Sequence, residues 1–439
     1  MYDYPLGAST SLISAVQQFA RLDYSVDVFI SEAGFNACPV SFKDKEVTVR
    51  VIKPLDSFLS LLLRRLWIYG YIKKKFVKVT FEEISGFIDF NIKFLYFSLM
   101  DSQRYESLRS DSPETFNKKI SRLCALLLHP LWKFQKILTE MTIDEYDLII
   151  GVEPKGLVIA QLLAHSKRSS PKVVYFNMEL LLEKECIKKQ RKILKMLERA
   201  CNQRSFLTVI QDKHRAGHLI ADNSLDPKKV MCIPVCSFGP AVQNKSDYLQ
   251  NLFNIEKNKK IILYAGNIIE WSMCLELAEA AQTWSEKYVL VLHTWRPDAK
   301  DDQYVRKIIP LTKSNKVYLS LNPLDYSDLS KLVSSADFGV IFYKNLGENF
   351  FETGNSSNKL AQYLQFGLPV ITIDFPSFLK VIKKYDCGKS TNTPMDIQNL
   401  AETIDIKYNY YRTNAFRCYR EMFDISKYFT ILEEKINHE

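Results

Sequence analysis

The segment from Asn355 to Asp374 constrains the fold of this chain more than any other. Its first residues are small and polar, its middle is periodic and apolar, and Gly367 and Pro369 lead into the apolar run 370–373. Glycine after a periodic stretch is typical of a helix C-terminus, and a short apolar run bounded by turn residues is consistent with a buried strand. The segment therefore predicts a helix that turns sharply into a strand inside a sheet.

The start of this predicted helix also has the chemistry to bind an anion. The first N–H groups of a helix have no partner within it and carry a partial positive charge, so they can bind a phosphate. Side chains at this end would add hydroxyl, amide and ammonium donors: Asn355, Ser356, Ser357, Asn358 and Lys359. Gln362 could follow them about one turn further along the same face. Serine and asparagine are also common helix caps that bind no ligand, and that explanation stays open here.

Strand-like and helix-like patterns alternate along most of the chain. The expected strands are 25–30, 48–52, 147–152, 173–176, 207–211, 230–234, 261–265, 288–293, 317–321, 338–343 and 370–373. The expected helices are 9–22, 113–141, 156–165, 186–199, 214–221, 274–284, 326–334 and 411–436, besides the one starting near Ser356. Such alternation predicts parallel βαβ units in open, doubly wound sheets. The segment 88–100 is rich in aromatic residues and fits either a helix or a strand.

The length of 439 residues is too great for one hydrophobic core, so we expect two domains. A polar stretch from 236 to 260 contains Gly239 and Pro240 and marks the boundary. The expected division is 1–238, 239–410 and a final helix in 411–439. The nine cysteines contain no C-x-x-C pair, and no secretory signal opens the chain. We therefore expect reduced thiols in a cytoplasmic protein.

The net charge of +9 favours an anionic partner. No nucleic-acid-binding motif occurs, so nucleic acid is not expected. The segment 57–78 instead mixes leucine and aromatic residues with Arg64, Arg65, Lys73, Lys74, Lys75 and Lys78. The two arginines interrupt the apolar run, which excludes a membrane span but suits a helix lying on the inner face of the plasma membrane. Each such cation would contribute about 1 kcal/mol near anionic lipid. A core helix with a charged edge is the alternative.

Several stretches of the chain resemble the GT-B glycosyltransferases, most of all bacterial enzymes that build surface polysaccharides. The most specific stretch runs from Lys359 to Val370, and the others are 146–156, 175–180, 210–215, 264–267 and 335–340. The resemblance implies an α/β fold of two doubly wound Rossmann-like domains facing across a cleft, with the last helix crossing back to the N-domain. It also implies that 1–238 offers the acceptor and that 239–410 binds the donor.

The activity implied by this resemblance is transfer of a sugar from a nucleotide-diphosphate sugar to a hydroxyl of a glycan or lipid-linked acceptor. The nucleotide sugar would be a co-substrate, and no cofactor is expected. Many members carry two glutamates in the donor helix, where this chain has Gly354 and Gln362. Many also have arginine and lysine in the loop where this chain has Asn267 and two isoleucines. The retaining or inverting outcome stays open.

The diphosphate charge would then be met by the helix start, by Lys359 and by Arg296. The remaining donor-side candidates are Gly266, Asn267 and His293, each at or just after an expected strand end. At the start of the chain, Gly7, Ala8 and Ser9 could present N–H groups to a phosphate or to an acceptor hydroxyl. His214 and Arg215 open a helix and are expected on its surface or at the rim of the cleft.

Two glutamates are candidates for the catalytic base. Glu153 follows the expected strand 147–152, and Glu179 follows the expected strand 173–176. A carboxylate at such a position could take the proton from an acceptor hydroxyl, as an inverting transferase requires. The two are rivals for one role, or one orients the other; a solvated loop glutamate is the plainer explanation. Asp337, which directly precedes a strand, is interpreted as structural.

No Asp-x-Asp pair occurs in the sequence, which fits an enzyme that needs no metal to hold the diphosphate. Two other functions stay open. One is a nucleotide-sugar epimerase of the same fold, which would need no acceptor. The other is a degenerate transferase fold that acts as a partner subunit, since the arginine, lysine and glutamates named above are missing.

Overall fold

The computed structural model describes residues 9–31, 42, 44–52, 146–166, 171–296, 298–322, 324 and 326–438. These residues fall into two compact units. The first lies within Ile52–Val209 and Ala216–Met231, and the second comprises the N-terminal residues to Val51, Ile210–Arg215 and Cys232–Glu439. The predictions for 57–78, 88–100, 113–141, Gly7 and Ala8 fall outside the described residues.

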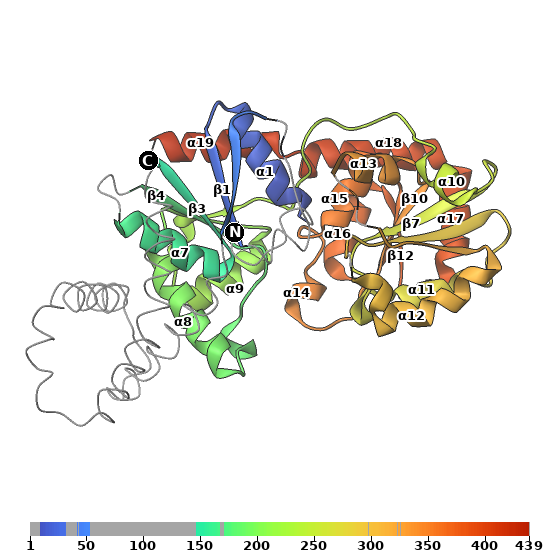
Figure 1. The fold of residues 1–439 in the computed structure, drawn as a ribbon, viewed down its shortest axis with the longest axis horizontal. Coiled ribbons are helices and arrows are strands. Elements are labelled where there is room, and N and C mark those ends of the chain that lie inside the picture. The colour runs from blue at the N-terminus through green and yellow to red at the C-terminus, as the bar shows by residue number, and fades with distance from the viewer. Residues whose placement is uncertain are drawn as a thin grey trace, which may run out of the picture. The chain divides into compact units, whose positions relative to one another are not determined.

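The first unit is built on a four-stranded sheet in the order β3-β4-β5-β6 (Figure 1). Its strands are β3 (Leu148–Val152), β4 (Lys172–Phe176), β5 (Leu207–Ile210) and β6 (Val230–Cys232). The pairs β3-β4 and β4-β5 are parallel, as the alternating pattern predicts. The helices are α7 (Glu153–Ser166), α8 (Lys189–Gln203) and α9 (Lys213–Asn223), with short 3-10 turns at Glu183–Glu185 and Pro227–Lys229. Helix α7 is apolar on most sides because it packs against both the sheet and α8.

The second unit is built on a six-stranded sheet in the order β12-β11-β10-β7-β8-β9, in which every neighbouring pair is parallel. The strands are β7 (Lys260–Ala265), β8 (Tyr288–His293), β9 (Val317–Ser320), β10 (Phe338–Ile341), β11 (Val370–Ile373) and β12 (Gly388–Thr391). Strands β8, β10 and β11 are buried along their whole length, which explains their continuous apolar runs.

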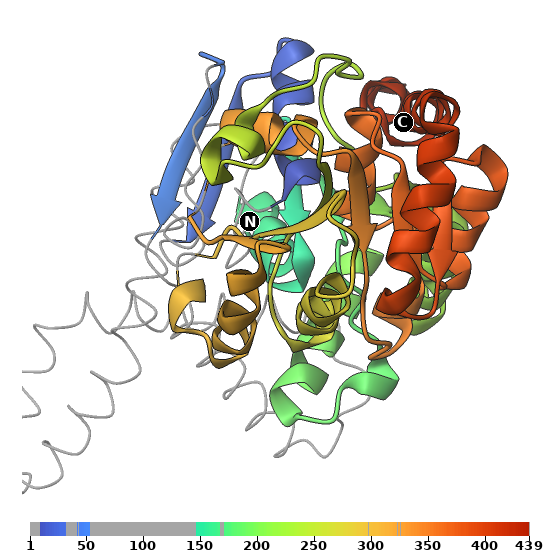
Figure 2. The ribbon, with the colours of Figure 1, turned by 90° about the vertical axis from the view of Figure 1, so that its right-hand side faces the viewer.

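Helices cover both faces of this sheet. Those of the second unit are α10 (Tyr248–Phe253), α11 (Cys274–Ala281), α12 (Gln303–Ile308), α13 (Tyr326–Ser334), α14 (Glu348–Phe351), α15 (Asn358–Gln365), α16 (Pro376–Tyr385), α17 (Ile397–Ile406), α18 (Tyr408–Cys418) and α19 (Ser426–His438). Helices α11 and α12 lie on one face, and α13 and α15 lie on the other (Figure 1). Helix α17 contacts strands β11 and β12, and Figure 2 shows the last helices of the chain, in orange-red to red, along one side of this unit.

The same unit contains the first elements of the chain, α1 (Thr10–Arg21), β1 (Val26–Ser31) and β2 (Val47–Ile52). Strands β1 and β2 form a separate two-stranded sheet. Phe19 on α1 contacts Phe429 on α19, with ring centroids 4.9 Å apart. Aromatic contact therefore joins the two ends of the described chain.

Most of the predicted elements in the described residues are present, with some corrected bounds. The expected helix 411–436 is wrong as a single helix: α18 ends at Cys418, a π-helical turn spans Tyr419–Phe423, and α19 begins at Ser426. The break occurs because Asp424 is extended and its carboxylate accepts from the Ser426 N–H at 3.1 Å, which caps a new helix. Helix α7 begins at Glu153, three residues before the expected start. No helix among the described residues is long and apolar enough to cross a bilayer.

Candidate functional site

The second sheet has a topological switch point between β7 and β10. From β7 the chain proceeds to β8 on one side, and from β10 it proceeds to β11 on the other. In open α/β sheets, ligands bind outside the carboxyl ends of the strands at such a point. Gly266 and Asn267 follow β7 there, and Tyr343 closely follows β10. A side chain on Gly266 would lie 2.6 Å from Lys359 Nζ, so the lysine of α15 reaches this point directly.

Lys359 is buried at the switch point, with only 9% of the residue exposed. Its ammonium group donates to Tyr343 Oη at 3.1 Å, and it lies 4.7 Å and 4.9 Å from the ring centroids of Tyr264 and Tyr343. In the described part of the chain, no carboxylate forms an ion pair with it. Taking an ammonium group out of water costs several kcal/mol, and contacts with aromatic faces return about 2 kcal/mol. The surroundings of Lys359 therefore suit an anion.

The N-terminus of α15 is capped as the sequence predicts. Ser357 is the N-cap, and its Oγ accepts from the Leu360 N–H at 3.2 Å. At the other end Gly367 adopts φ +68°, the left-handed conformation of a helix-ending glycine. Within the same unit, Ser356 Oγ lies 3.3 Å from Arg215 Nη1, and Asn358 Oδ1 accepts from the Ser11 N–H at 3.4 Å. Ser357 thus caps the helix, while Ser356 and Asn358 bring the Arg215 guanidinium and the Ser11 N–H group to the helix start.

Two amide oxygens beside this helix start are buried without a hydrogen bond. They belong to Asn267 and Asn355, and neither oxygen has a partner. A buried polar atom left in this state costs about 1–3 kcal/mol. A bound hydroxyl or N–H group would satisfy them. The backbone oxygen of Asn355 is already used, because it accepts from the Val235 N–H at 2.8 Å.

His293 and Arg296 are placed differently from Lys359. His293 is buried at the end of β8, its Nδ1 lies 2.9 Å from Ser320 Oγ, and burial lowers its pKa to about 4. The ring is therefore neutral near pH 7. Arg296 pairs with Asp298 through two hydrogen bonds of 2.8 and 3.1 Å and with Asp302 at 2.9 Å. Its charge is already countered by two carboxylates.

Sequence reasoning gave no binding role to three residues of this region. Arg215 was expected on the helix surface or at the rim of the cleft, and its exposure of 1% excludes the surface. The reason is that the start of α9 packs within the unit and Arg215 reaches Ser356. Tyr264 and Tyr343 resemble ordinary core residues at strand ends, and only the structure shows that both rings face the same ammonium group. The available signal was Tyr264 near the end of β7, two residues before Gly266.

In the first unit, Glu153 sits on a sharp turn from β3 into α7. Its backbone has φ +62°, a conformation that non-glycine residues rarely adopt. Small residues make the turn possible: a side chain on Gly151 would lie 2.6 Å from Leu157 Cα and 3.0 Å from the Gly156 carbonyl oxygen. Strained turns of this kind expose a reactive side chain at the end of a strand in some α/β enzymes. Observed strain of this type is a reason to consider a functional role.

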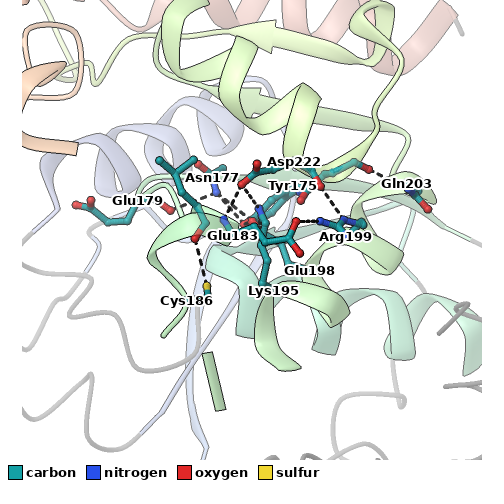
Figure 3. A network of polar contacts seen from close by, with 12 residues as sticks. Tyr175, Asn177, Glu179, Glu183, Cys186, Lys195, Glu198, Arg199, Gln203 and Asp222 are labelled. Carbon is teal, nitrogen blue, oxygen red and sulfur yellow. Dashed lines mark hydrogen bonds and ion pairs between the residues drawn. The ribbon is translucent and has the colours of Figure 1, made fainter. Parts of the chain in front are cut away.

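The carboxyl group of Glu153 is held by backbone donors. Oε1 accepts from the N–H groups of Met178 at 2.9 Å and Glu179 at 3.0 Å. Burial of the carboxyl group raises its pKa to about 8, the negative charge of Glu179 adds to this rise, and the two N–H bonds oppose it. The Glu179 side chain itself is exposed and points away from the buried polar groups of the unit (Figure 3). Of the two rivals, Glu153 has the pKa that a base working near neutral pH needs.

Comparisons with known proteins show what this architecture resembles. No family model matches the chain, and no curated protein matches its sequence. Among solved structures, Anabaena HepE bound to UDP and glucose matches at TM-score 0.54 and 14% identity, over 70% of this chain and 81% of that one. Sucrose-phosphate synthase from Thermosynechococcus elongatus matches at TM-score 0.54 and 17% identity, over 71% and 79%.

A third match extends over the whole chain. The α,α-trehalose-phosphate synthase (UDP-forming) of Burkholderia xenovorans, bound to glucose-6-phosphate, matches at TM-score 0.55 and 11% identity, over 100% of this chain and 98% of that one. The chain has the GT-B fold. The predicted fold class of two doubly wound Rossmann-like domains is therefore confirmed.

The structure explains one departure from the GT-B pattern. Many GT-B members have a glutamate where this chain has Gly354. Here a side chain on Gly354 would lie 2.5 Å from the Ser377 carbonyl oxygen, and the Gly354 N–H donates to Ser377 Oγ at 3.0 Å. Helix α16 occupies the space that the glutamate would need. Gln362, in place of the second glutamate, is buried on α15.

The other predicted residues have simpler roles in this GT-B chain. Ser9 is buried, and its Oγ accepts from the Leu12 N–H at 3.4 Å, which caps α1. Asp337 accepts from the Ile261 N–H at 2.8 Å and from Lys245 Nζ at 2.6 Å, so its structural interpretation is confirmed. Among the described residues, no group of three or more His, Cys, Asp or Glu side chains could hold a metal ion.

Proposed function

We propose that the protein is a glycosyltransferase that uses a nucleotide-diphosphate sugar. One observation carries the proposal: the buried ammonium group of Lys359 lies at the switch point of the second sheet without a carboxylate partner in the described chain. A diphosphate is the anion that such a site in this fold suits best. HepE, a protein of similar fold, has been solved with UDP-glucose, so a UDP-sugar is the first donor to test.

The rest of the donor site follows from the groups around Lys359. The proposed diphosphate accepts from the start of α15 and from Lys359, and Arg215 adds a second cation near Ser356. The unpaired amide oxygens of Asn267 and Asn355 accept from hydroxyl groups of the sugar or the ribose. Gly266, which has no side chain, leaves room for the Lys359 side chain itself. His293 and Arg296 stay candidates for contacts with the sugar rather than for countering charge.

In the proposed reaction, an acceptor hydroxyl forms a bond to the anomeric carbon of the sugar. The bond from that carbon to the diphosphate oxygen breaks, and the nucleotide diphosphate leaves with the electron pair. Glu153 takes the proton of the acceptor hydroxyl, as an inverting transferase requires. Lys359 counters the charge that develops on the leaving group. The anomeric configuration of the product decides between inversion and retention.

Thermal unfolding with a panel of nucleotide diphosphates and nucleotide sugars tests the donor site. A ligand that binds the folded chain raises the melting temperature by mass action. Lys359→Ala should weaken binding of the best ligand by about 10-fold or more, because a charge-assisted contact is lost. Lys316→Ala is the matched control: Lys316 is also 9% exposed in the same unit, but it already pairs with Glu286 at 2.7 Å. The Lys316→Ala protein should be less stable than the natural chain and should bind the nucleotide ligand with unchanged affinity.

Other outcomes of the ligand panel would contradict the proposed donor site or favour one of the two other functions. Equal affinity in the chain with and without Lys359 would reject the proposed phosphate site. No binding of any nucleotide would favour a non-catalytic partner subunit. Release of free nucleotide without an acceptor would favour the epimerase.

The finer features of the function rest on sequence alone. A glycan or lipid-linked acceptor, a part in surface polysaccharide synthesis, work without a metal and a place in the cytoplasm belong to this proposal. Contact with the inner face of the membrane rests on the basic and aromatic composition of 57–78, outside the described residues. Sedimentation with anionic vesicles tests that contact, and a chain that stays in the supernatant at low salt would remove it.

A further inference from the structure

Figure 3 shows a buried polar network in the first unit, near Glu179. It joins Tyr175 on β4 to Lys195 and Glu198 on α8, and none of these three residues is more than 2% exposed. Tyr175 Oη donates to Glu198 Oε1 at 2.7 Å, and Lys195 Nζ donates to Glu198 Oε2 at 3.0 Å. Each carboxylate oxygen of Glu198 is therefore held by its own donor.

Asn177 connects this network to the turn. Its side-chain Nδ2 donates to Tyr175 Oη at 2.9 Å and to the carbonyl oxygen of Glu179 at 3.3 Å. Its backbone N–H donates to the Val209 carbonyl at 3.0 Å. The turn 177–179 carries the two N–H groups that bind the carboxyl group of Glu153. Asn177 therefore fixes the orientation of those donors.

The network is anchored on its far side by α9. Lys195 Nζ lies 3.6 Å from Asp222 Oδ2, and the same oxygen accepts from the Glu183 N–H at 2.8 Å. Arg199 donates to the Asp222 carbonyl oxygen at 2.6 Å and pairs with Glu183. Strand β4 and helices α8 and α9 are thus joined through one set of charges.

Stability does not account for this arrangement. Replacing a buried ion pair by well-packed apolar residues is often neutral or stabilising. An apolar pair in place of Lys195 and Glu198 would, however, leave the Tyr175 hydroxyl without its acceptor and loosen the link to Asn177. What the charged pair provides is an acceptor for the Tyr175 hydroxyl, which in turn accepts from Asn177.

We propose that Tyr175 and Glu198 are positioning residues for the carboxyl group of Glu153. They act through Asn177, which fixes the turn whose two N–H groups bind that carboxyl group. The inference rests on the proposed function only in giving Glu153 a part in sugar transfer. The positioning itself can be measured without any substrate.

The charges around Glu153 allow a directional test. Glu179, after β4, and Glu198, on α8, raise its pKa, while the two backbone N–H bonds lower it. Burial and the charge of Glu198 raise the pKa of Tyr175 well above its usual range, so its hydroxyl is neutral. Tyr175→Phe therefore changes no charge but removes the Tyr175 hydroxyl that accepts from Asn177 Nδ2, which weakens the hold on the turn. The pKa of Glu153 should then rise by about one unit for a weakened hydrogen bond to its charged form.

The experiment compares two pairs of proteins by urea unfolding between pH 5 and pH 10. One pair is the natural chain and Glu153→Gln; the other carries Tyr175→Phe in both members. The pH dependence of the stability difference within a pair reports the pKa of Glu153. We expect a value near 8 in the first pair and a higher one in the second. The same pKa in both pairs would overturn the proposal.

Two further variants separate positioning from loss of folding. Tyr419→Phe is the matched control: Tyr419 is equally buried, but its hydroxyl lies in the other unit, 2.6 Å from the Gly239 carbonyl oxygen and 3.2 Å from that of Ser237. It should cost stability at every pH and leave the pKa of Glu153 unchanged. If Tyr175→Phe does not fold, Asn177→Ala cuts the same link and should give the same rise. A failure of the proposed function would give a different result: the Glu153→Gln variant would keep full transferase activity.

Discussion

At the scale of single residues, Glu153 unites backbone strain with a raised pKa. A left-handed conformation at a residue with a Cβ costs about 1–2 kcal/mol. Here it places the carboxyl group against two N–H donors while burial and the Glu179 charge keep it protonated near pH 7. The left-handed backbone and the raised pKa both lower the stability of the fold, which favours a functional role for this side chain. We propose that this role is to act as a base with a pKa close to the working pH.

The first prediction concerns the pH dependence of transfer. If Glu153 is the base, kcat/KM should rise as the pH increases through about 8, because only the ionised carboxylate accepts a proton. Glu153→Gln should lower kcat about 10²- to 10⁴-fold and abolish this rise. Initial rates over pH 6–9.5 measure both effects. Glu179→Gln is the control, and it should keep most of the activity because its side chain is exposed.

A profile that falls with pH would show that the protonated form of Glu153 is needed instead. A Glu153→Gln variant with full activity would remove it from the mechanism.

Sequence reasoning could single out residues where local rules apply. Lys359 and Ser357 were identifiable because a helix start has unpaired N–H groups, and Glu153 because it follows a strand. Lys195 and Glu198 were not, because charged residues three apart on a basic helix normally face solvent. Their burial depends on the packing of α8 against the sheet, and no local pattern contains that information.

At the scale of elements, α15 is held at both ends. Ser357 caps its start, and the ring of Phe416 on α18 fills the space beside Gly367 at its end. Any side chain at 367 would lie 2.3 Å from a carbon of that ring. The position of the helix start therefore depends on contacts at the opposite end.

The second prediction follows from this contact. Gly367→Ala should destabilise the protein by about 2–5 kcal/mol through an unfavourable φ and overpacking against Phe416. Nucleotide binding should weaken as well, since α15 must move. Gly217→Ala is the matched control: Gly217 lies inside α9 with no atom near the missing side chain, so alanine should stabilise by about 1 kcal/mol. Urea unfolding and calorimetric binding measure the pair. A Gly367→Ala protein as stable as the natural chain would contradict the account.

Element prediction succeeded where apolar runs are continuous. Strands β8 and β11 and helix α13 agree with the expected bounds at both ends. Strand β12 was missed because Gly388–Thr391 lies at the edge of the sheet and has a polar sequence. Helices α10, α12, α14, α16 and α17 were missed, and most of these are short or open at a proline or in a polar stretch, where periodicity is hard to detect.

At the scale of the whole molecule, two doubly wound sheets divide the proposed work. The second supplies a buried cation and a helix start for the donor, and the first supplies a carboxyl group held by its own backbone. The fold class was predictable because strand and helix patterns alternate over the described halves of the chain. The identities of donor sugar and acceptor were not, since contacts to them come from backbone groups and from side chains brought together only by folding.

The protonated carboxyl group of Glu153 has a consequence for the folding reaction itself. At pH 6 to 7 an unfolded chain, with an ordinary pKa of 4.5 for this group, has released the proton that the folded chain keeps. Folding should therefore draw about one proton from the buffer. Calorimetric unfolding enthalpies should differ between phosphate and Tris, whose ionisation heats differ, and Glu153→Gln should reduce the difference. Identical enthalpies in both buffers would mean that the carboxyl group enters the native state already ionised.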